Sequence, residues 1–504
     1  MKSMLCCGNQ STGMIEVPRN PWWDTSSRQA LERRQSALLR RFLRSKVAPF
    51  SAYYGKLFAE QGIDPKSIRN TGDLTRLPFT SKADLAEPRD FLLAPEEEAL
   101  MRQPSTWRSV LKRGALRTRE RLSEEFRPVM LTSTTGRSSA PVPFLYTSHD
   151  VANLQACGRR LMEICRTTAE FRIVNAFPFA PHLAFWQAHY AGLGGGRFVL
   201  STGGGKVMGT DGNIRLIDRL QADALIAMPT FLYHLLQHAA SSGMRWPKLR
   251  VLVLGGEKVP QGMRRKLRAL CAELGAGAVE IVSTYGFTEG KMAWSECPVG
   301  EGETTGYHLY PDFAYVEIVD PKTGEPVPEG RPGEIVCTPL DARGTVVLRY
   351  RTGDLIDGGL VYDPCPACGR RCPRLIGNIS RISDVRRLNL SKIKGVLVDF
   401  NALERVLDDT EGLGAWQIEV RKLNDDPLEI DRIVVHAVAM DGAESSLAER
   451  IRERLSEAAE LTPNEILFHD WDAMRELQGV GRELKEKKVV DHRPKAPGGS
   501  GKES

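Results

Sequence analysis

LRVLVLGG (residues 249–256) is one of five short apolar segments that recur between residues 171 and 286. The others are FRIVNAF (171–177), GRFVLS (196–201), ADALIAM (222–228) and AVEIVSTYG (278–286). Stretches with helical spacing, such as TFLYHLLQHAASSG (230–243), separate them. Short apolar strands that alternate with helices are typical of a largely parallel sheet covered by helices. The sequence therefore predicts an α/β fold for this part of the chain.

The rest of the chain predicts further units. The chain has 504 residues, more than a single hydrophobic core usually serves. After about residue 306, strands and turn signals such as PKTG and PEGRPG replace the alternation, which indicates a β-rich part. Beyond residue 384, the helix-like FNALERVL, the strand-like WQIEVRKL and RIVVHAVAM and a further helix predict a small α+β domain.

We therefore expect a large N-terminal α/β domain with a β-rich subdomain and a small, mobile C-terminal α+β domain. The expected boundaries are a flexible tail at 1–25, the N-terminal domain at 26–383, a β-rich part with a zinc knuckle at 306–378, the C-terminal domain at 384–493 and a disordered tail at 494–504.

Residues 97–126 are charged, rich in arginine and poor in β-branched residues. This composition predicts a solvated helical insertion in the N-terminal domain. A basic patch that contacts nucleic acid or another protein is the alternative. The segment lacks the interleaved aromatic residues that bind single-stranded nucleic acid, which favours the first interpretation.

The composition is that of a globular protein, with 41% hydrophobic and 26% charged residues and a formal net charge of +6. We expect no nucleic-acid partner, because the basic residues are scattered among acids. We expect no membrane insertion, because no apolar run approaches the roughly 18 residues that a spanning helix needs. The start, MKSMLCCGNQ, is a poor secretory signal, so we expect a cytoplasmic protein. Ten cysteines without such a signal argue against a disulfide framework.

Four polar segments follow one another along the chain: TSTTGR (132–137), STYGFTEG (283–290), YRTGD (350–354) and ISRISD (379–384). In this order they resemble the AMP-forming adenylating superfamily, which includes acyl-CoA synthetases, adenylation domains and luciferases. YYGKLFAEQGIDPKSIRNTGDLTRLPFTSKADL (53–85) is similar to the N-terminal stretch of the phenylacetate–CoA ligase family within it.

The resemblance implies ATP-dependent adenylation of a carboxylic acid, and within this family an aromatic acid such as phenylacetate or benzoate. The acyl group would then pass to coenzyme A, with release of AMP and pyrophosphate. The chemistry asks the protein mainly to position anions and neutralise charge. The implied cofactors and partners are ATP, Mg²⁺, coenzyme A and a small carboxylic acid. The resemblance is also compatible with a homodimer.

Residues 132–137 are the first of these segments. Alone, they read as a polar turn between two strands. The resemblance implies that they wrap the β- and γ-phosphates of ATP, through Thr132, Ser133, Thr134, Thr135, Gly136 and Arg137. The family has glycine and lysine where Ser133 and Arg137 stand, and arginine keeps the charge but not the compact ammonium group.

The other segments supply the remaining implied nucleotide contacts. Tyr285 and Gly286 would lie beside adenine, Thr288 at phosphate and Glu289 on Mg²⁺, a hard cation that prefers oxygen ligands. Upstream, GGEKVP (255–260) would frame adenine through Gly256 and Glu257.

Asp354 would accept both ribose hydroxyls, and Arg381 matches the family arginine that precedes the interdomain hinge. A buried tyrosine and a helix-capping Thr–Glu pair are the bland alternatives for the STYGFTEG segment.

The family carries a catalytic lysine near its C terminus. LKEKKVVDHR (484–493) is similar to that region and selects Lys485, with Lys487 and Lys488 as rivals. This lysine would reach the reacting carboxylate and the α-phosphate. His182, in the aromatic segment AFPFAPHLAFWQAHY (176–190), is a candidate for the acid pocket, with the start of a core helix as the alternative.

Cys365 and Cys368 form a CxxC knuckle that needs two further ligands for tetrahedral Zn²⁺. ECPVGEGETTGYH supplies Cys297 and His308, and some members of the family bind structural zinc through such a set. Cys372 competes for the fourth place, and buried reduced thiols are the alternative to a metal.

Two other functions remain open at this point. The acyl-adenylate can pass to a carrier protein or an amine instead of coenzyme A. The altered residues in the motifs can also mark a catalytically weakened protein that binds nucleotide or a partner.

Overall fold

A computed structural model gives the architecture. It describes residues 22–101, 103–134, 141–382, 392–393, 396–397, 400–422, 431–440, 442, 444–459, 462–480 and 487–493.

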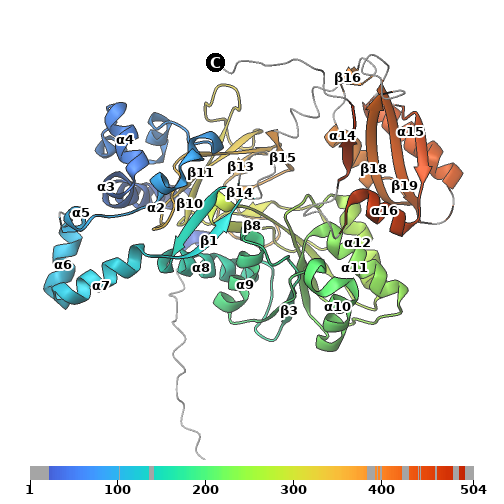
Figure 1. Cartoon of the computed structure of the whole chain (residues 1–504), viewed down its shortest axis with the longest axis horizontal. Helices are drawn as coiled ribbons and strands as arrows, with labels where there is room; N and C mark the ends of the chain where they lie inside the picture. Colours follow the sequence, from blue (N-terminus) through green and yellow to red (C-terminus); the bar gives the residue numbers. More distant parts are fainter. Residues whose placement is uncertain are drawn as a thin grey trace, which may run out of the picture.

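The five apolar segments form the parallel part of one large sheet, as predicted (Figure 1). They correspond to β3 (Arg172–Asn175), β4 (Phe198–Ser201), β5 (Ala224–Ala227), β6 (Val251–Gly255) and β7 (Glu280–Phe287). The nine-stranded sheet has the order β13-β14-β9-β8-β7-β6-β5-β3-β4. Strand β7 pairs in antiparallel fashion with β8 (Met292–Ser295), so the sheet is mixed.

Helices cover both faces of this sheet because successive strand residues point to opposite sides. Val174 packs on one face, against α10 (Gly205–Leu220), α11 (Pro229–Ser241) and α12 (Gln261–Glu273). Its neighbour Ile173 packs on the other face, against α8 (Ser148–Ile164) and α9 (Leu183–Gly195). The parallel strands are therefore buried on both sides, which explains their continuous apolar sequences.

The β-rich segment contributes to two sheets. Its antiparallel sheet contains β10 (Ala314–Val319), β11 (Gly333–Pro339), β12 (Tyr350–Ile356) and β15 (Ile379–Arg381). Three two-residue strands instead extend the large sheet: β9 (Tyr307–His308), β13 (Leu360–Val361) and β14 (Arg374–Leu375). The β-rich part is thus joined to the large sheet by its own strands.

The N-terminal helices pack against this β-rich part. They are α1 (Trp22–Thr25), α2 (Arg28–Phe42), α3 (Ala48–Phe50) and α4 (Ala52–Glu60), with a π-helical turn at Leu43–Val47. Short 3₁₀ turns follow at Pro65–Ser67, Thr71–Arg76, Lys82–Ala86 and Pro88–Phe91. The ring of Trp23 meets Tyr310 edge-on at 5.6 Å, and the hydroxyl of Tyr54 accepts a hydrogen bond from the backbone of Leu348 at 2.6 Å. The N-terminal helices and the β-rich part therefore share one hydrophobic core.

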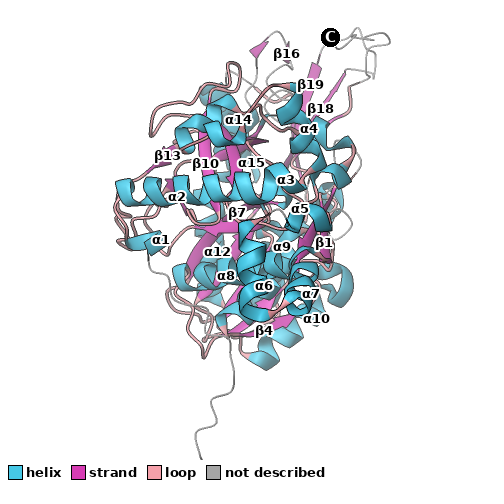
Figure 2. Ribbon diagram, turned by 90° about the vertical axis from the view of Figure 1, so that its left-hand side faces the viewer, coloured by secondary structure: helices cyan, strands magenta, loops and turns pink. Residues whose placement is uncertain are grey.

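A helical arm leaves this core. It consists of α5 (Glu97–Met101), α6 (Pro104–Arg113) and α7 (Ala115–Phe126), in the segment expected to be a charged helical insertion. It lies at the left of Figure 1 and nearest the viewer in Figure 2. The chain then enters the hairpin of β1 (Pro128–Ser133) and β2 (Pro143–Thr147).

The C-terminal part has its own four-stranded sheet, ordered β20-β19-β18-β21. Its strands are β18 (Leu413–Lys422), β19 (Asp431–Ala439), β20 (Glu465–Phe468) and β21 (Val489–Asp491). Helices α14 (Phe400–Asp408) and α15 (Glu444–Ala459) pack on one face, and α16 (Trp471–Gln478) packs on the other. A small hairpin of β16 (Lys392–Ile393) and β17 (Val396–Leu397) precedes them.

The C-terminal sheet docks on α11 and α12 of the large domain. The ring of Trp471 lies 5.8 Å from that of Tyr233, and Lys266 Nζ donates to the carbonyl of Gly414 at 3.0 Å. A Cβ at Gly262 would overlap the carbonyl oxygen of Asp408, so glycine lets α12 approach α14 closely.

Candidate active site

The candidate site begins at the carboxyl ends of β6 and β7, the edge where open α/β sheets bind ligands. Strand β6 ends at Gly255, where a Cβ would overlap Oγ1 of Thr284 in the neighbouring strand. Gly256 follows with φ of +84°, a conformation that favours glycine. The two glycines therefore let the chain turn directly beside the strand that carries Tyr285.

Glu257 completes this turn and holds α11 in place. Its Oε2 accepts hydrogen bonds from Oγ1 of Thr230 at 2.7 Å and from the Thr230 backbone at 3.3 Å. Thr230 lies in the first turn of α11, where backbone N–H groups lack helical partners and favour an anion. The carboxylate thus ties the proposed adenine turn to a helix.

Asp354 lies at the centre of a polar cluster formed by three of the predicted residues. Its Oδ2 accepts a hydrogen bond from the hydroxyl of Tyr285 at 2.8 Å, and its Oδ1 lies 3.0 Å from Nε of Arg381. The register of β12 and β15 places Asp354 opposite Arg381. Burial and the Asp354 charge raise the pKa of Tyr285 well above its ordinary value, so the phenol keeps the proton that it donates.

Arg381 is tied to β12 by a second contact. One of its terminal nitrogens donates to the carbonyl of Thr352 at 2.8 Å. The hydroxyl of Thr352 accepts from the backbone of Asp354 at 3.0 Å, so the carboxylate and the guanidinium are oriented by the same residue. The cluster therefore presents an oriented anion next to a cation.

Glu289 lies on the 3₁₀ turn Thr288–Gly290, directly after β7. Its Oε1 accepts a hydrogen bond from the hydroxyl of Tyr350 at 2.7 Å. Burial and the charge of Glu289 raise the pKa of Tyr350, so this phenol also stays protonated. Glu289 and Asp354 both act electrostatically on Arg381, which places the two carboxylates in one charged region.

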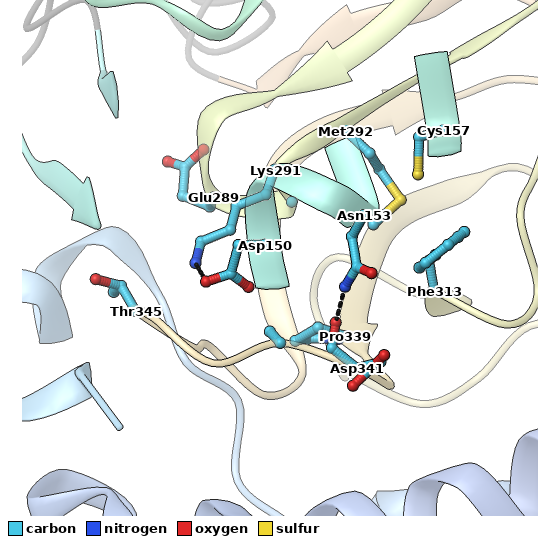
Figure 3. A pocket seen from close by; sticks show the side chains of 12 residues that line it. Asp150, Asn153, Cys157, Glu289, Lys291, Met292, Phe313, Pro339, Asp341 and Thr345 are labelled. Carbon is cyan, nitrogen blue, oxygen red and sulfur yellow. Dashed lines mark hydrogen bonds and ion pairs between the residues drawn. The ribbon is translucent and has the colours of Figure 1, made fainter. Parts of the chain in front are cut away.

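A buried ion pair between Lys291 and Asp150 lies close to Glu289 (Figure 3). Lys291 and Asp150 point toward each other, with Nζ 3.5 Å from Oδ2. Nζ of Lys291 also donates to the carbonyl of Leu145 at 2.8 Å and lies 4.7 Å from the ring centre of Tyr146. Burial lowers the pKa of Lys291. The lysine therefore fixes the end of the Glu289 turn to the β2 strand.

Sequence reasoning missed Asp150 and Lys291. Asp150 forms a capping box with Thr147 at the start of α8 and accepts a further bond from the backbone of Gly344 at 2.7 Å. The signal was present in TSHD (147–150), where Thr and Asp stand at the spacing of a capping box.

The first residues of the predicted phosphate loop, Thr132 to Thr134, lie at the end of β1. Thr132 is buried and its hydroxyl donates to that of Tyr146 at 3.3 Å, while the Thr134 hydroxyl accepts from the backbone of Val142 at 2.9 Å. Nδ1 of His182 donates to the carbonyl of Ser133 at 2.9 Å. His182 thus supports the base of the hairpin. Thr135, Gly136 and Arg137 lie outside the described residues.

The predicted knuckle residues converge on one point. The ligand atoms of Cys297, His308, Cys365 and Cys368 all lie within 4.8 Å of one another. The Sγ atoms of Cys297 and Cys365 are 3.6 Å apart, and Sγ of Cys368 lies 3.2 Å from Nε2 of His308. Such spacings and soft donors fit tetrahedral Zn²⁺, with Zn–S near 2.3 Å.

The surroundings of this cluster also suit a metal. Nδ1 of His308 donates to the carbonyl of Ser295 at 3.3 Å, an arrangement that orients metal-bound histidines. Hydrogen bonds, first of all with Cys297, lower the pKa of Cys365, which favours the thiolate that metals bind. Cys372 is buried but does not belong to the set, so it is not the fourth ligand.

Lys485 lies outside the described residues. Its rival Lys488 is already engaged, because Nζ lies 2.9 Å from Oδ1 of Asp408 and 4.8 Å from the ring centre of Trp416. The backbone of Lys487 donates to Gln478 at 3.0 Å. Lys488 thus links the segment before β21 to the end of α14.

Comparisons with known proteins agree with this architecture. The sequence pattern of the AMP-binding enzyme family matches residues 140–339. A phenylacetate-coenzyme A ligase from Thermus thermophilus is 27% identical over 80% of this chain and 81% of its own. One from Escherichia coli strain K12 is 26% identical over 69% of this chain and 72% of its own.

Solved structures share the fold. One of 2-hydroxyisobutyryl-CoA ligase in the postadenylation state has a TM-score of 0.73 and 18% identity, covering 94% of this chain and 92% of that one. The same enzyme in its thioesterification state has a TM-score of 0.60 and 17% identity, covering 94% of this chain and 91% of that one.

In the described part of the chain, every helix is too short or too polar to cross a membrane.

Proposed function

We propose that this chain is an AMP-forming acid–CoA ligase of the AMP-binding superfamily and that its acid is aromatic, of the phenylacetate or benzoate type. The reaction forms an acyl-adenylate from the acid and ATP and then transfers the acyl group to coenzyme A. The aromatic acid is supported by the phenylacetate-coenzyme A ligases that match between 66% and 80% of this chain.

The cluster of Tyr285, Asp354 and Arg381 carries the proposal. Each carboxylate oxygen has two acceptor positions, so Asp354 can bind Tyr285 and Arg381 and still accept hydrogen bonds from the two ribose hydroxyls. The phenol and guanidinium orient the carboxylate before the nucleotide arrives, which reduces the ordering cost of binding.

Glu289 would hold Mg²⁺, with Thr288 at the phosphate beside it. A carboxylate oxygen is a ligand that this ion prefers, and Tyr350 fixes the carboxylate through one oxygen. The ion would supply charge neutralisation at the phosphates.

The hairpin tip at 132–137 would contact the β- and γ-phosphates, with His182 holding its base. The turn at Gly256 and Glu257, together with Tyr285 and Gly286, would surround adenine. Lys485 would approach the reacting carboxylate from the C-terminal part, which we take as a separate domain at 384–493 that withdraws before thioester formation.

The cluster of Cys297, His308, Cys365 and Cys368 would bind structural zinc. Its ligands come from the segment just after β8, from β9 and from the loop after β13, so the metal would fasten these parts of the large sheet to one another. No step of the reaction needs this metal.

Pyrophosphate exchange with a panel of acids tests the proposal. Phenylacetate and benzoate should support exchange, whereas acetate and hexanoate should support it poorly. Acceptors offered afterwards, namely coenzyme A, a holo carrier protein and a primary amine, are distinguished by mass spectrometry of the products. Transfer to the carrier or amine would replace the coenzyme A assignment. Absence of exchange with every acid would instead indicate a nucleotide-binding protein without ligase activity.

A further inference from the structure

The α6–α7 part of the helical arm concentrates positive charge. Residues 104–121 contain six cationic side chains and one acidic side chain, a net charge of +5. The whole chain has a formal net charge of +6. Outside this segment, acidic and basic side chains therefore nearly balance, and the other acids of the arm itself lie at its two ends, in 97–98 and 124–125.

The end of the arm also exposes large apolar side chains. Leu111 is 85% exposed and Leu116 is 71% exposed, and they lie on either side of Gly114, where the chain turns from α6 into α7. Trp107 lies one turn before Leu111 on α6 and is 52% exposed. Lys112, Arg113 and Arg117 are interspersed with the leucines in the sequence. The tip thus combines apolar side chains with cations.

The indole N–H of Trp107 already has a hydrogen-bond partner, so the ring can enter an apolar environment. Its Nε1 donates to the carbonyl of Met101 at 2.8 Å within the arm. Burying the ring therefore sacrifices no hydrogen bond, and the apolar area of the tip gains free energy when it leaves water.

The base of the arm is fixed to the body. Glu125 pairs with Lys46 at 3.0 Å and with Arg343 at 2.5 Å, and Gln103 donates to the carbonyl of Ser45 at 2.6 Å. Both ends of the α6–α7 hairpin are thus held, while its tip projects from the molecule (Figures 1 and 2). Such a rigid projection presents the leucines without a large ordering cost.

We propose that the tip of the arm docks on a membrane surface that contains anionic lipid, with Leu111, Leu116 and Trp107 in the interfacial layer. Anionic headgroups complement the basic segment 104–121, and tryptophan and leucine beside cations are typical of helices that bind the interface. Such a contact lies on the surface of the bilayer and needs no spanning helix.

Other occupants fit the observations less well. A second copy of this chain would bring two basic arms together or place one on a nearly neutral surface. A nucleic acid would neutralise the cations but would leave the two leucines against phosphate and water. A protein partner would need an apolar pocket rimmed by acids to receive this convex tip, whereas a bilayer accepts convex apolar side chains without a preformed pocket.

Co-sedimentation of the full chain with vesicles tests the proposal. We expect binding to vesicles of phosphatidylcholine and phosphatidylglycerol in equal parts and little binding to phosphatidylcholine alone. The Lys112→Glu/Arg113→Glu variant should bind at least fivefold more weakly for each cation lost. The Leu111→Ser/Leu116→Ser variant, whose charge is unchanged, should bind at least about tenfold more weakly.

Matched variants on the body control for nonspecific effects. Leu193→Ser/Phe198→Ser removes two apolar side chains that are similarly exposed, and Lys248→Glu/Lys322→Glu makes the same charge change elsewhere. Both should bind like the unaltered chain, and circular dichroism and thermal melting should show every variant folded.

Several results would overturn the proposal. Failure to bind the anionic vesicles at low salt would do so, and equal weakening by the body variants would show that the tip is not the contact. Retained binding in the leucine variant would show that the apolar tip does not insert. If the chain does not bind the vesicles but binds a protein through the tip, the arm is a site for a protein partner.

Discussion

Asp354→Asn should weaken ATP binding far more than it weakens the fold. The asparagine side chain has nearly the same shape, but one acceptor oxygen becomes an NH₂ group. Oδ1 and Oδ2 of Asp354 are directed at Arg381 and Tyr285, so the amide keeps one of these contacts and loses its ability to accept both ribose hydroxyls.

The magnitude follows from the hydrogen bonds involved. A hydrogen bond to a charged group is worth about 1.5–3 kcal/mol, so loss of one ribose contact should raise the KM for ATP roughly 10- to 150-fold. The ion pair contributes little to stability, because the Arg381 side chain is 53% exposed and solvent screens the pair. We therefore expect Tm to fall by no more than about 2 °C.

Pyrophosphate exchange measured against ATP concentration gives the KM, and calorimetric titration with AMP gives the affinity without turnover. Asp357→Asn is the matched control: it changes a carboxylate just beyond β12 that accepts bonds from Asn378. A folded Asp354→Asn variant whose KM for ATP stays within about twofold of normal, a change of only about 0.4 kcal/mol, would refute the assignment of Asp354 to the ribose.

Three further predictions concern other parts of the molecule. Lys485→Ala should abolish adenylation but spare thioester formation from a preformed acyl-adenylate, as a coupled assay for AMP and acyl-CoA would show; an unimpaired first step would exclude this lysine. Elemental analysis should find about one zinc per chain, lost in Cys365→Ser but retained in Cys372→Ser, and zinc-free protein of full stability would contradict the metal site. Burial lowers the pKa of Lys266 to about 8, so the folded state resists its protonation. Unfolding free energy should therefore rise between pH 8 and 10.5 relative to Lys266→Met, by up to about 3 kcal/mol in urea titrations; parallel pH curves would show that the shift is absent.

Much of the fold follows from local sequence patterns. The strands β3 to β7 are continuous apolar segments because helices cover both of their faces, and this pattern is readable in one sequence. The strands β9, β13 and β14 have only two residues each, too few for any periodicity. Their pairing with the large sheet, which binds the β-rich part to it, could not be predicted from their residues.

The candidate site was predicted where its residues lie in motifs and was missed where they act through tertiary contacts. Tyr285, Asp354 and Arg381 belong to three of the recognised segments. The contact of Asp354 with Arg381 depends on the register between β12 and β15, and its contact with Tyr285 joins two different sheets. The sequence alone does not indicate a structural role for Lys291, because an isolated lysine after a strand usually faces water. Its burial against Asp150 arises from the packing of α8 beside β8, which no local pattern encodes.

The shared core of the N-terminal helices and the β-rich part has a consequence for biosynthesis. Trp23 packs on Tyr310, and the backbone of Arg371 donates to the carbonyl of Asp24 at 2.7 Å. These partners leave the ribosome roughly 290 to 350 residues after the helices, a delay of roughly 15–70 s at ordinary rates of synthesis. The first helices to be translated must therefore wait with their apolar faces uncovered. A chain in this state is a client for chaperones, and a slow stretch of translation before residue 310 would lengthen its exposure.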